Sequence, residues 1–379
     1  MTNKERVHAA LEGKPVDRSP VTALYCQLYH LDHFAELTGL PAWRRHEWLA
    51  MSPEQHVALF RRMHEAAPFE LLQPQWSPGR KWRERQEFVE QDGHAFRHDG
   101  ETDAWIRLDE STGSGHASEY HANETRHVFT REDIERRLPL PRPGETPSRD
   151  GLEYMDAVAR EYGRSEFVLS GGVIGTVYSC GSHVGQTNLF AMLIEEPELV
   201  EALCERITLC NLAAIRALAA AGGDGIYIDD ATATSDMISP AMYERFSLPY
   251  MQAMVREIHR LGHKAIVIYF GGVMDRLELI AATGADGFSY EASMKSFVND
   301  TAEIARRIGD RMTLFSNIDP VAILQKSADD ALATEIARQV TAGRRARGFI
   351  ISPASPITPA TPLARVRRFI ELARDQGAR

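Results

Sequence analysis

Two short apolar runs of this sequence end in residues that can carry acid–base chemistry. Asp229 and Asp230 end the run GIYIDD, and Tyr290 and Glu291 end the run GFSYE. Burial raises the pKa of a carboxylate and suits it to general acid or base catalysis, and two adjacent carboxylates can bind a divalent metal or a substrate cation. We therefore take Glu291 and Asp229 as catalytic candidates, and Asp229, Asp230 and Glu291 as candidate metal ligands. The structural alternatives are that one aspartate caps a turn and that Glu291 pairs with Lys295.

Further polar and aromatic residues follow other apolar runs. Tyr269 and Phe270 end the run KAIVIYF before two glycines, which predicts an aromatic wall and makes Tyr269 a third catalytic candidate. Asp319 precedes Pro320 and is equally explained as a helix cap. No serine lies in a GxSxG sequence, which disfavours a hydrolase nucleophile. The candidates for substrate binding are Tyr25, Gln27, Trp76, Phe270, Tyr290, Asn317 and Ser355.

The apolar runs that precede these residues have the pattern of strands in a parallel sheet. Nearly continuous apolar runs that alternate with helices are typical of a sheet buried on both faces. With strands also expected at 20–25, 69–76 and 167–173, the count reaches about eight, and we predict one α/β domain over residues 1–379, a (β/α)₈ TIM barrel. An open doubly wound sheet is the alternative, disfavoured because no GxGxxG follows the first strand. The five C-terminal runs are 223–230, 264–272, 285–291, 312–320 and 348–355.

The position of the candidates follows from this fold. Polar residues at the C-terminal ends of the strands form one end of a barrel, and enzymes of this fold build their active sites there. We call this end the mouth. Because side chains alternate along a strand, one of the two aspartates is expected to face the interior and the other the helices.

Residues of about 86–129 break the barrel pattern. The segment EFVEQDGHAFRHDGETDAWIRLDE alternates polar and apolar residues around an Asp92-Gly93 turn, which predicts a β-rich insertion after the second strand. Because long insertions are often lids or binding loops, we expect it to fold over the mouth. The fourteen histidines contain no HExxH or HxH pair; those best placed to act as ligands are His30 and His33 after the first strand, and His116 and His121 in the insertion.

The composition excludes several classes of protein. Of the 379 residues, 44% are hydrophobic and 25% charged, which are ordinary values for a globular enzyme, and the net charge of -10 argues against nucleic acid as a partner. No apolar stretch is long enough for a membrane span, and the polar N-terminal segment does not resemble a signal peptide. Four scattered cysteines form no CxxC pair. We expect a cytoplasmic protein without a membrane partner; its oligomeric state is left open, a homodimer included.

Several long segments of the chain resemble the uroporphyrinogen decarboxylase superfamily. The resemblance covers most of the chain and implies a (β/α)₈ barrel. Within the superfamily, one branch decarboxylates uroporphyrinogen and another contains cobalamin-dependent methyltransferases. The segments that carry it are NKERVHAALEGKPVDRSPV, GGDGIYIDDATATSDMISPAMYERFSLPYMQAMVREIHRLG, GADGFSYEAS, LFSNIDP and SPASPITPATPLARVRRFIELA.

Departures from both branches narrow the function that the resemblance implies. The decarboxylases carry an arginine-rich PVWxMRQAGRY segment that binds substrate carboxylates and an essential aspartate after the second strand; this chain has PVTALYCQLYHLDHF and LLQPQW. The methyltransferases commonly bind zinc through His-x-Cys on strand five and a Cys on strand eight. The matching positions here are Ile268, Phe270 and Ser355, so we expect that zinc site to be absent.

These departures leave a demethylase-type methyltransferase as the first hypothesis. In members of that kind, a small methylated or methoxylated substrate passes its methyl group to a corrinoid on a partner protein, and some use a carboxylate-containing metal site. This chain has no cobalamin-binding DxHxxG sequence, so the corrinoid protein would be a separate partner. The alternatives are a decarboxylase or lyase of a small acid or tetrapyrrole, and a barrel that binds a ligand without catalysis.

Overall fold

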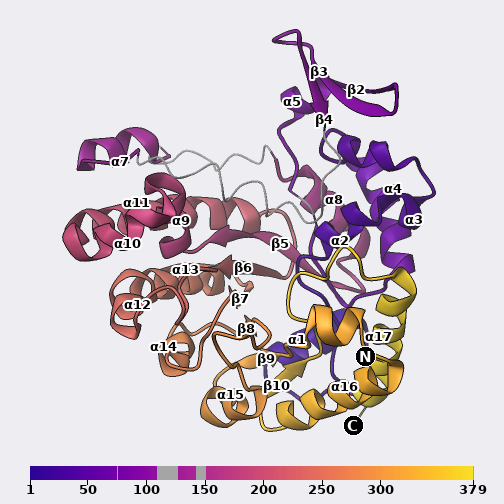
Figure 1. The fold of residues 1–379 in the computed structure, drawn as a ribbon, viewed down its shortest axis with the longest axis vertical. Coiled ribbons are helices and arrows are strands. Elements are labelled where there is room, and N and C mark those ends of the chain that lie inside the picture. The colour runs from indigo at the N-terminus through magenta and orange to yellow at the C-terminus, as the bar shows by residue number, and fades with distance from the viewer. Residues whose placement is uncertain (75, 109–126, 142–150, 379) are drawn as a thin grey trace.

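The computed structural model describes residues 1–74, 76–108, 127–141 and 151–378. Its centre is a curled, seven-stranded parallel sheet with the order β1-β5-β6-β7-β8-β9-β10, surrounded by helices (Figure 1). All five apolar runs of the C-terminal half are strands of this sheet, as predicted. The strands are β1 (Leu71–Leu72), β5 (Phe167–Ile174), β6 (Gly225–Asp229), β7 (Lys264–Tyr269), β8 (Gly287–Tyr290), β9 (Thr313–Phe315) and β10 (Gly348–Ile350).

The segment at residues 20–25 lies between the two edges of this sheet without being a full strand. Val21 forms a parallel bridge with Ile351, which follows β10. On the other side the Glu70 N–H, just before β1, donates to the Val21 carbonyl, and the Thr22 hydroxyl donates to the Leu71 carbonyl at 3.1 Å. The prediction of a strand here is wrong in detail. Pro20 lacks an N–H for a ladder, and Tyr25 turns the chain with a φ of 56°.

Inward-facing side chains of the strands fill the interior of the curled sheet. Leu169, Ile266, Ile268, Phe315 and Ile350 form one buried cluster there. Each strand contributes every second residue to it, because successive side chains point to opposite faces. Helix α1 (Asn3–Leu11) adds Val7, Ala10 and Leu11 to the same cluster and closes the N-terminal end of the sheet. The opposite end, the mouth, is left for the residues that follow the strands.

The outward-facing side chains pack against the helices and form the larger apolar core. The predicted helices of the C-terminal half are present, whereas α9 and α10 were not expected. In addition to α1, the described helices are α2 (Cys26–Asp32), α3 (Phe34–Thr38), η1 (Ala42–Leu49), α4 (Pro53–Ala66), α5 (Arg80–Glu84), α7 (Arg131–Arg137), α8 (Glu153–Tyr162), α9 (Thr176–Val184), α10 (Gln186–Glu195), α11 (Pro197–Ala219), α12 (Pro240–Phe246), α13 (Leu248–Arg260), α14 (Leu277–Ala281), α15 (Thr301–Ile308), η2 (Pro320–Gln325), α16 (Asp329–Gly343) and α17 (Leu363–Gln376). None of them is long and apolar enough to cross a membrane.

The insertion after β1 contains an antiparallel sheet of its own. Strands β2 (Gln86–Gln91), β3 (His94–Asp99) and β4 (Ala104–Leu108) pair in sequence, and Asp92 and Gly93 form the expected turn with positive φ at both positions. This small sheet projects from the body of the molecule and contacts η1 (Figure 1). Residues 109–126, with His116 and His121, lie outside the described residues, so the covering of the mouth by this insertion stays a prediction.

Candidate active site

The two aspartates at the end of β6 face opposite sides of the sheet, as side-chain alternation predicts. Asp229 accepts a short hydrogen bond through Oδ2 from the Tyr25 hydroxyl at the mouth. Asp230 instead accepts from the Ser247 hydroxyl at 2.6 Å and from the Tyr178 N–H at 3.2 Å. Tyr178 lies in the first turn of α9, where the helix dipole favours a negative charge. Asp230 is therefore a helix cap, and the prediction that it helps to bind a metal is wrong, because its carboxylate points away from Asp229.

The environment of Asp229 favours its protonated form. Burial raises the pKa of its carboxyl group to about 7, and the nearby charge of Asp230 adds to this effect, while the Tyr25 hydroxyl and the Ala231 N–H oppose it. The Tyr25 phenol keeps its proton, because burial and the charge of Asp229 raise its pKa well above the usual range. The Oδ1 of Asp229 is buried and completes no hydrogen bond with a described residue. Near neutral pH the site thus holds a carboxyl group with one oxygen free to carry a transferable proton.

Aromatic rings enclose this carboxyl group. The ring of Tyr25 lies 5.9 Å from that of Tyr227 and 5.7 Å from that of Phe270, measured between centroids. Tyr227 belongs to β6 and Phe270 directly follows β7, so adjacent strands supply the two walls. The predictions of an aromatic wall at Phe270 and of Tyr25 at the mouth fit this geometry. An aromatic surround excludes water, which is the physical reason for the raised pKa of Asp229.

Glu291 supplies a second carboxyl group of similar acidity at the end of β8. Burial raises its pKa to about 7, the charge of Asp319 raises it further, and the Ala292 N–H, at 2.8 Å from Oε1, opposes both. Glu291 forms no ion pair with a described residue, so the alternative pairing with Lys295 is not found. The strand register aligns Asp229 with Ile268 and Ile268 with Ser289. Glu291 is two residues beyond Ser289 and therefore lies one layer further out along the barrel axis than Asp229.

Sequence reasoning missed two residues of this site. Gln73 follows β1 and accepts a hydrogen bond through Oε1 from the Tyr25 N–H at 2.6 Å, while its buried Nε2 has no partner among the described residues. Tyr227 lies two positions before Asp229, on the same face of β6, and burial raises its pKa to about 12. Both could have been found from the sequence, because side chains alternate along a strand: Tyr227 shares the face of Asp229, and Gln73 shares the face of Leu71. The amide nitrogen of Gln73 lies near the Tyr227 hydroxyl, where it opposes the rise of the Tyr227 pKa, at the end of the strand next to Tyr25.

Three predicted site residues lie on the outer face of the sheet, and their placement at the mouth is wrong. Tyr269 packs its ring among the helices and shares a 2.7 Å hydrogen bond with the Tyr243 hydroxyl. Tyr290 donates to Thr301 at 3.1 Å in the same outer core. Because side chains alternate along a strand, Tyr269 faces the side of the sheet opposite to Ile268, and Tyr290 the side opposite to Glu291. The amide nitrogen of Asn317 donates to the carbonyl oxygens of Glu291 and Asn299, both at 3.1 Å. Its amide oxygen accepts from Thr301 and Gln339, so the side chain is fully engaged in stabilising the fold and is not free for a substrate.

The comparison with known proteins agrees with the fold of this site. The sequence model of the uroporphyrinogen decarboxylase (URO-D) family matches residues 118–376. The chain belongs to the uroporphyrinogen decarboxylase family. A solved structure of a methyltransferase from Methanosarcina mazei resembles this member of the family with a TM-score of 0.66 over 99% of each chain, at 20% identity. At that identity the likeness shows the fold alone.

Curated relatives of this family member carry two different activities in their names. A methylcobamide:CoM methyltransferase from Methanosarcina acetivorans is 28% identical over 59% of this chain and 62% of that protein. A uroporphyrinogen decarboxylase from Coxiella burnetii is 28% identical over 48% of each chain. Another decarboxylase, from Tolumonas auensis, is 31% identical over 62% of this chain and 65% of that protein. The chain thus aligns with about half to somewhat under two thirds of the length of these relatives.

The positions that correspond to the zinc ligands of the methyltransferase branch carry no soft ligand. Ile268 and Phe270 contribute apolar side chains to the interior cluster. Ser355 is buried, and its hydroxyl has no partner among the described residues, so it stays a candidate for substrate binding. The described part of the chain also contains no group of three histidines, cysteines or carboxylates arranged to hold a metal. These residues do not fit a zinc site, and no chemical step is assigned to one.

The remaining candidates have mixed positions. Gln27, on α2, has a buried Oε1 without a described partner and stays a candidate for substrate binding. Trp76 is 54% exposed, and its role at the mouth stays a prediction. His30 is fully buried beside the ring of Phe60, and burial lowers its pKa to about 3, which is typical of a core residue. His33 is occupied by Glu36 and a backbone carbonyl, so it is an improbable metal ligand.

Proposed function

We propose that the chain is a (β/α)₈ barrel enzyme that transfers a methyl group from a small methylated or methoxylated substrate to a corrinoid carried by a partner protein. The observation that carries the proposal is the carboxyl group of Asp229, whose raised pKa and unpartnered Oδ1 make it a proton donor near neutral pH. A methyl ether is a poor methyl donor unless its oxygen is protonated as the methyl group leaves. Names of relatives that act on a methylcobamide support the corrinoid.

Each residue of the mouth has a separate role in this reaction. When bound, the corrinoid supplies the cobalt that accepts the methyl group. The bond between the methyl carbon and the substrate oxygen breaks, its electron pair stays on the oxygen, and Asp229 transfers the proton from Oδ1 to that oxygen. Tyr25 donates to Oδ2 and stabilises the carboxylate that results. The rings of Tyr25, Tyr227 and Phe270 form a wall against which a methoxylated aromatic ring can pack.

Glu291 and Gln73 are suited to orienting the substrate. The Nε2 of Gln73 is a donor beside Tyr25, and Glu291 offers a second carboxyl group with a pKa of about 7 one layer further out. A divalent metal held by Asp229 and Glu291 would have no third ligand among the described residues. Four free cysteines suit a reducing compartment, and a cytoplasmic location belongs to the proposal.

Decarboxylation is the second candidate function, favoured by the names of several relatives and by the same proton donor, which could protonate a carbanion. A decarboxylase must hold a substrate carboxylate, most simply with a cation. Neither Asp229 nor Glu291 is paired with a described arginine or lysine, so neither brings a cation to the mouth that could hold a substrate carboxylate. This charge pattern is our reason for ranking methyl transfer first.

The test is an anaerobic assay with free cob(I)alamin as methyl acceptor and a panel of methoxybenzenes, methylamines and small aromatic acids. We expect methylcobalamin and the demethylated product in equal amounts, and an activity at least about 10²-fold lower for Asp229→Asn. The matched control is Asp310→Asn, whose carboxylate is 83% exposed. Release of carbon dioxide without methyl transfer would instead establish the decarboxylase, and saturable ligand binding without turnover would indicate a non-catalytic barrel.

A further inference from the structure

A cavity of about 280 Å³ lies between η1 and the small sheet β2–β3–β4, outside the barrel mouth. Aromatic side chains of Trp48, Trp82 and Phe88 line it, together with two arginines, Arg45 from η1 and Arg97 from β3. The guanidinium carbon of Arg97 lies 5.4 Å from the centre of the Trp82 ring, a cation–π contact. The volume is at the small end of ligand pockets and suits a ligand of one ring.

The arginines of this cavity lack the partners that arginines in proteins normally have. Neither Arg45 nor Arg97 forms an ion pair or a hydrogen bond with a described residue, and the Nε atom of each is buried. The buried indole N–H of Trp48 also has no partner in the part of the chain that the structure describes. Each unsatisfied buried donor costs free energy, and this applies to the Nε–H of each arginine and to the indole N–H, while the two arginine side chains as a whole are partly exposed. Three such donors in residues that line one cavity indicate a binding site for a ligand with hydrogen-bond acceptors.

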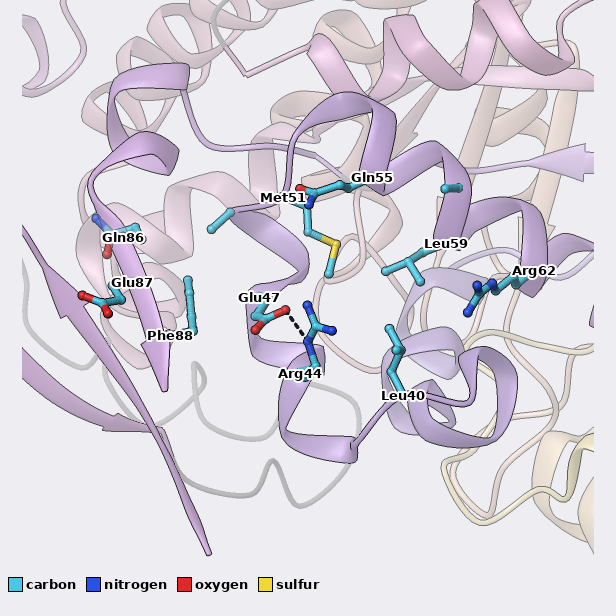
Figure 2. Close-up of a pocket in the computed structure, with 12 residues that line it drawn as sticks. Leu40, Arg44, Glu47, Met51, Gln55, Leu59, Arg62, Gln86, Glu87 and Phe88 are labelled. Carbon is cyan, nitrogen blue, oxygen red and sulfur yellow. Dashed lines mark hydrogen bonds and ion pairs between the residues drawn. The ribbon is translucent and has the colours of Figure 1, made fainter. Parts of the chain in front are cut away.

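A neighbouring cavity shows the usual arrangement. This second cavity, of about 510 Å³, shares Phe88 with the first and lies between η1, α4 and β2 (Figure 2). Its Arg44 points toward Glu47 and is paired with it at 2.8 Å, while Arg62 donates to the Thr38 carbonyl at 2.7 Å. Arg44 and Arg45 are adjacent on one helix, yet only Arg44 has a carboxylate partner. The missing partner is therefore a property of the first cavity rather than of the segment.

We propose that the cavity between η1 and the β2–β3–β4 sheet binds a planar aromatic carboxylate. The guanidinium groups of Arg45 and Arg97 would pair with the carboxylate, as guanidinium forks do with oxyanions of this geometry. Trp48, Trp82 and Phe88 would enclose the ring. His46 also lines the cavity; burial and then the charge of Arg45 lower its pKa, so it offers a neutral imidazole rather than a third cation.

This binding site is distinct from the proposed methyl transfer and does not depend on it. Its residues belong to α2, η1, α5 and the insertion, whereas the proton donor Asp229 lies on β6. A substitution at Asp229 should therefore leave binding in the cavity unchanged. Conversely, loss of binding in the arginine variants would occur whether or not methyl transfer is the activity of the mouth.

The experiment measures the affinity of the whole chain for benzoate by calorimetry and by quenching of tryptophan fluorescence. The probe variants are Arg45→Gln and Arg97→Gln. Each has a matched control that removes the same charge from the same helix or sheet: Arg44→Gln on η1 and Arg107→Gln, exposed on β4. The ligand controls are benzyl alcohol, which keeps the ring, and inorganic phosphate and cyclohexanecarboxylate, which keep the charge.

We expect saturable binding of benzoate that each probe variant weakens by about ten- to a hundredfold, the effect of losing one charge-assisted hydrogen-bonded pair. The control variants and Asp229→Asn should change the affinity by less than about twofold. Benzyl alcohol should bind much more weakly than benzoate. Equal affinity for phosphate would show a general anion site and overturn the aromatic part of the proposal. Absence of benzoate binding, or equal weakening by probe and control variants, would overturn all of it.

Discussion

Replacing Asp229 by asparagine should make the folded protein more stable at alkaline pH while it removes the proposed proton donor. The side chain keeps its shape, and the new amide oxygen can still accept from Tyr25. The substitution removes the negative charge that Asp229 carries when it is ionised. Burial makes that charge unfavourable in the folded protein and raises the carboxyl pKa from 3.8 to about 7. The prediction therefore tests the environment of Asp229 without any knowledge of the substrate.

The size and sign of the effect follow from linkage. The folded protein binds the Asp229 proton more tightly than the unfolded chain, so this group favours folding fully below pH 4 and loses that contribution as the pH rises to about 7. At about 1.4 kcal/mol per pKa unit, the shift corresponds to about 4 kcal/mol over the whole window. Between pH 5 and pH 8, the wild type should lose about 2 to 3 kcal/mol of stability relative to Asp229→Asn.

Urea titrations of both proteins at unit pH steps from 5 to 8 measure this difference. Comparison of the two proteins cancels the titration of groups that do not interact with Asp229 to first order, whereas Asp230, whose charge acts on Asp229, remains coupled to it. Asp310→Asn is the matched control, because its carboxylate is 83% exposed. If the free energy of unfolding of Asp229→Asn ran parallel to that of the wild type, Asp229 would be ionised throughout, and its role as a proton donor would have to be abandoned.

Three further substitutions test the rest of the site. Glu291→Gln should lower turnover by about 10²-fold, measured by the rate of methyl transfer, and a near-normal rate would remove Glu291 from the mechanism. Because the pKa of Glu291 is also raised to about 7, the variant should gain stability relative to the wild type as the pH rises from 5 to 8, measured by urea titration. Tyr25→Phe removes the donor that favours ionised Asp229, so the carboxyl pKa should rise above about 7 and the alkaline decline of activity should move to higher pH; an unchanged pH profile would contradict the pairing. Tyr269→Phe should cost about 1 kcal/mol of stability through loss of its hydrogen bond to Tyr243 and leave the rate almost unchanged. A large loss of rate without loss of stability would show that Tyr269 takes part in the reaction.

The strands and most of the helices could be predicted from the sequence, because their signals are local. Apolar runs bounded by polar residues mark β5 to β10, and their alternation with helices marks a parallel sheet. The prediction failed where the local signal was weak or was overruled. The segment after Pro20 forms single bridges in place of a strand, and β1 is reduced to Leu71 and Leu72. Helix α9 was not predicted; Gly175 precedes it and Gly181 interrupts its apolar pattern.

The candidate site was predicted in part, and the errors have one cause. Alternation within a strand fixes which residues share a face, so Asp229 and Asp230 had to diverge, as they do. It does not fix which face is inner, because a parallel sheet covered by helices is apolar on both sides. Tyr269 and Tyr290 were predicted at the mouth together with their neighbours Phe270 and Glu291, although alternation lets only one residue of each adjacent pair face inward.

The sequence by itself therefore determined the class of fold, the family and the presence of acids at the strand ends, all of which depend on local pattern or on similarity along the chain. The tertiary structure decided which of the two aspartates lies at the mouth, where we propose that it donates a proton. The Tyr25 hydroxyl and Asp229 are 204 residues apart in the chain, and only folding brings them together in an apolar surround that raises the pKa of the carboxyl group. The unpaired arginines 45 and 97 are a similar case, because the absence of a partner can be seen only once every neighbour is in place.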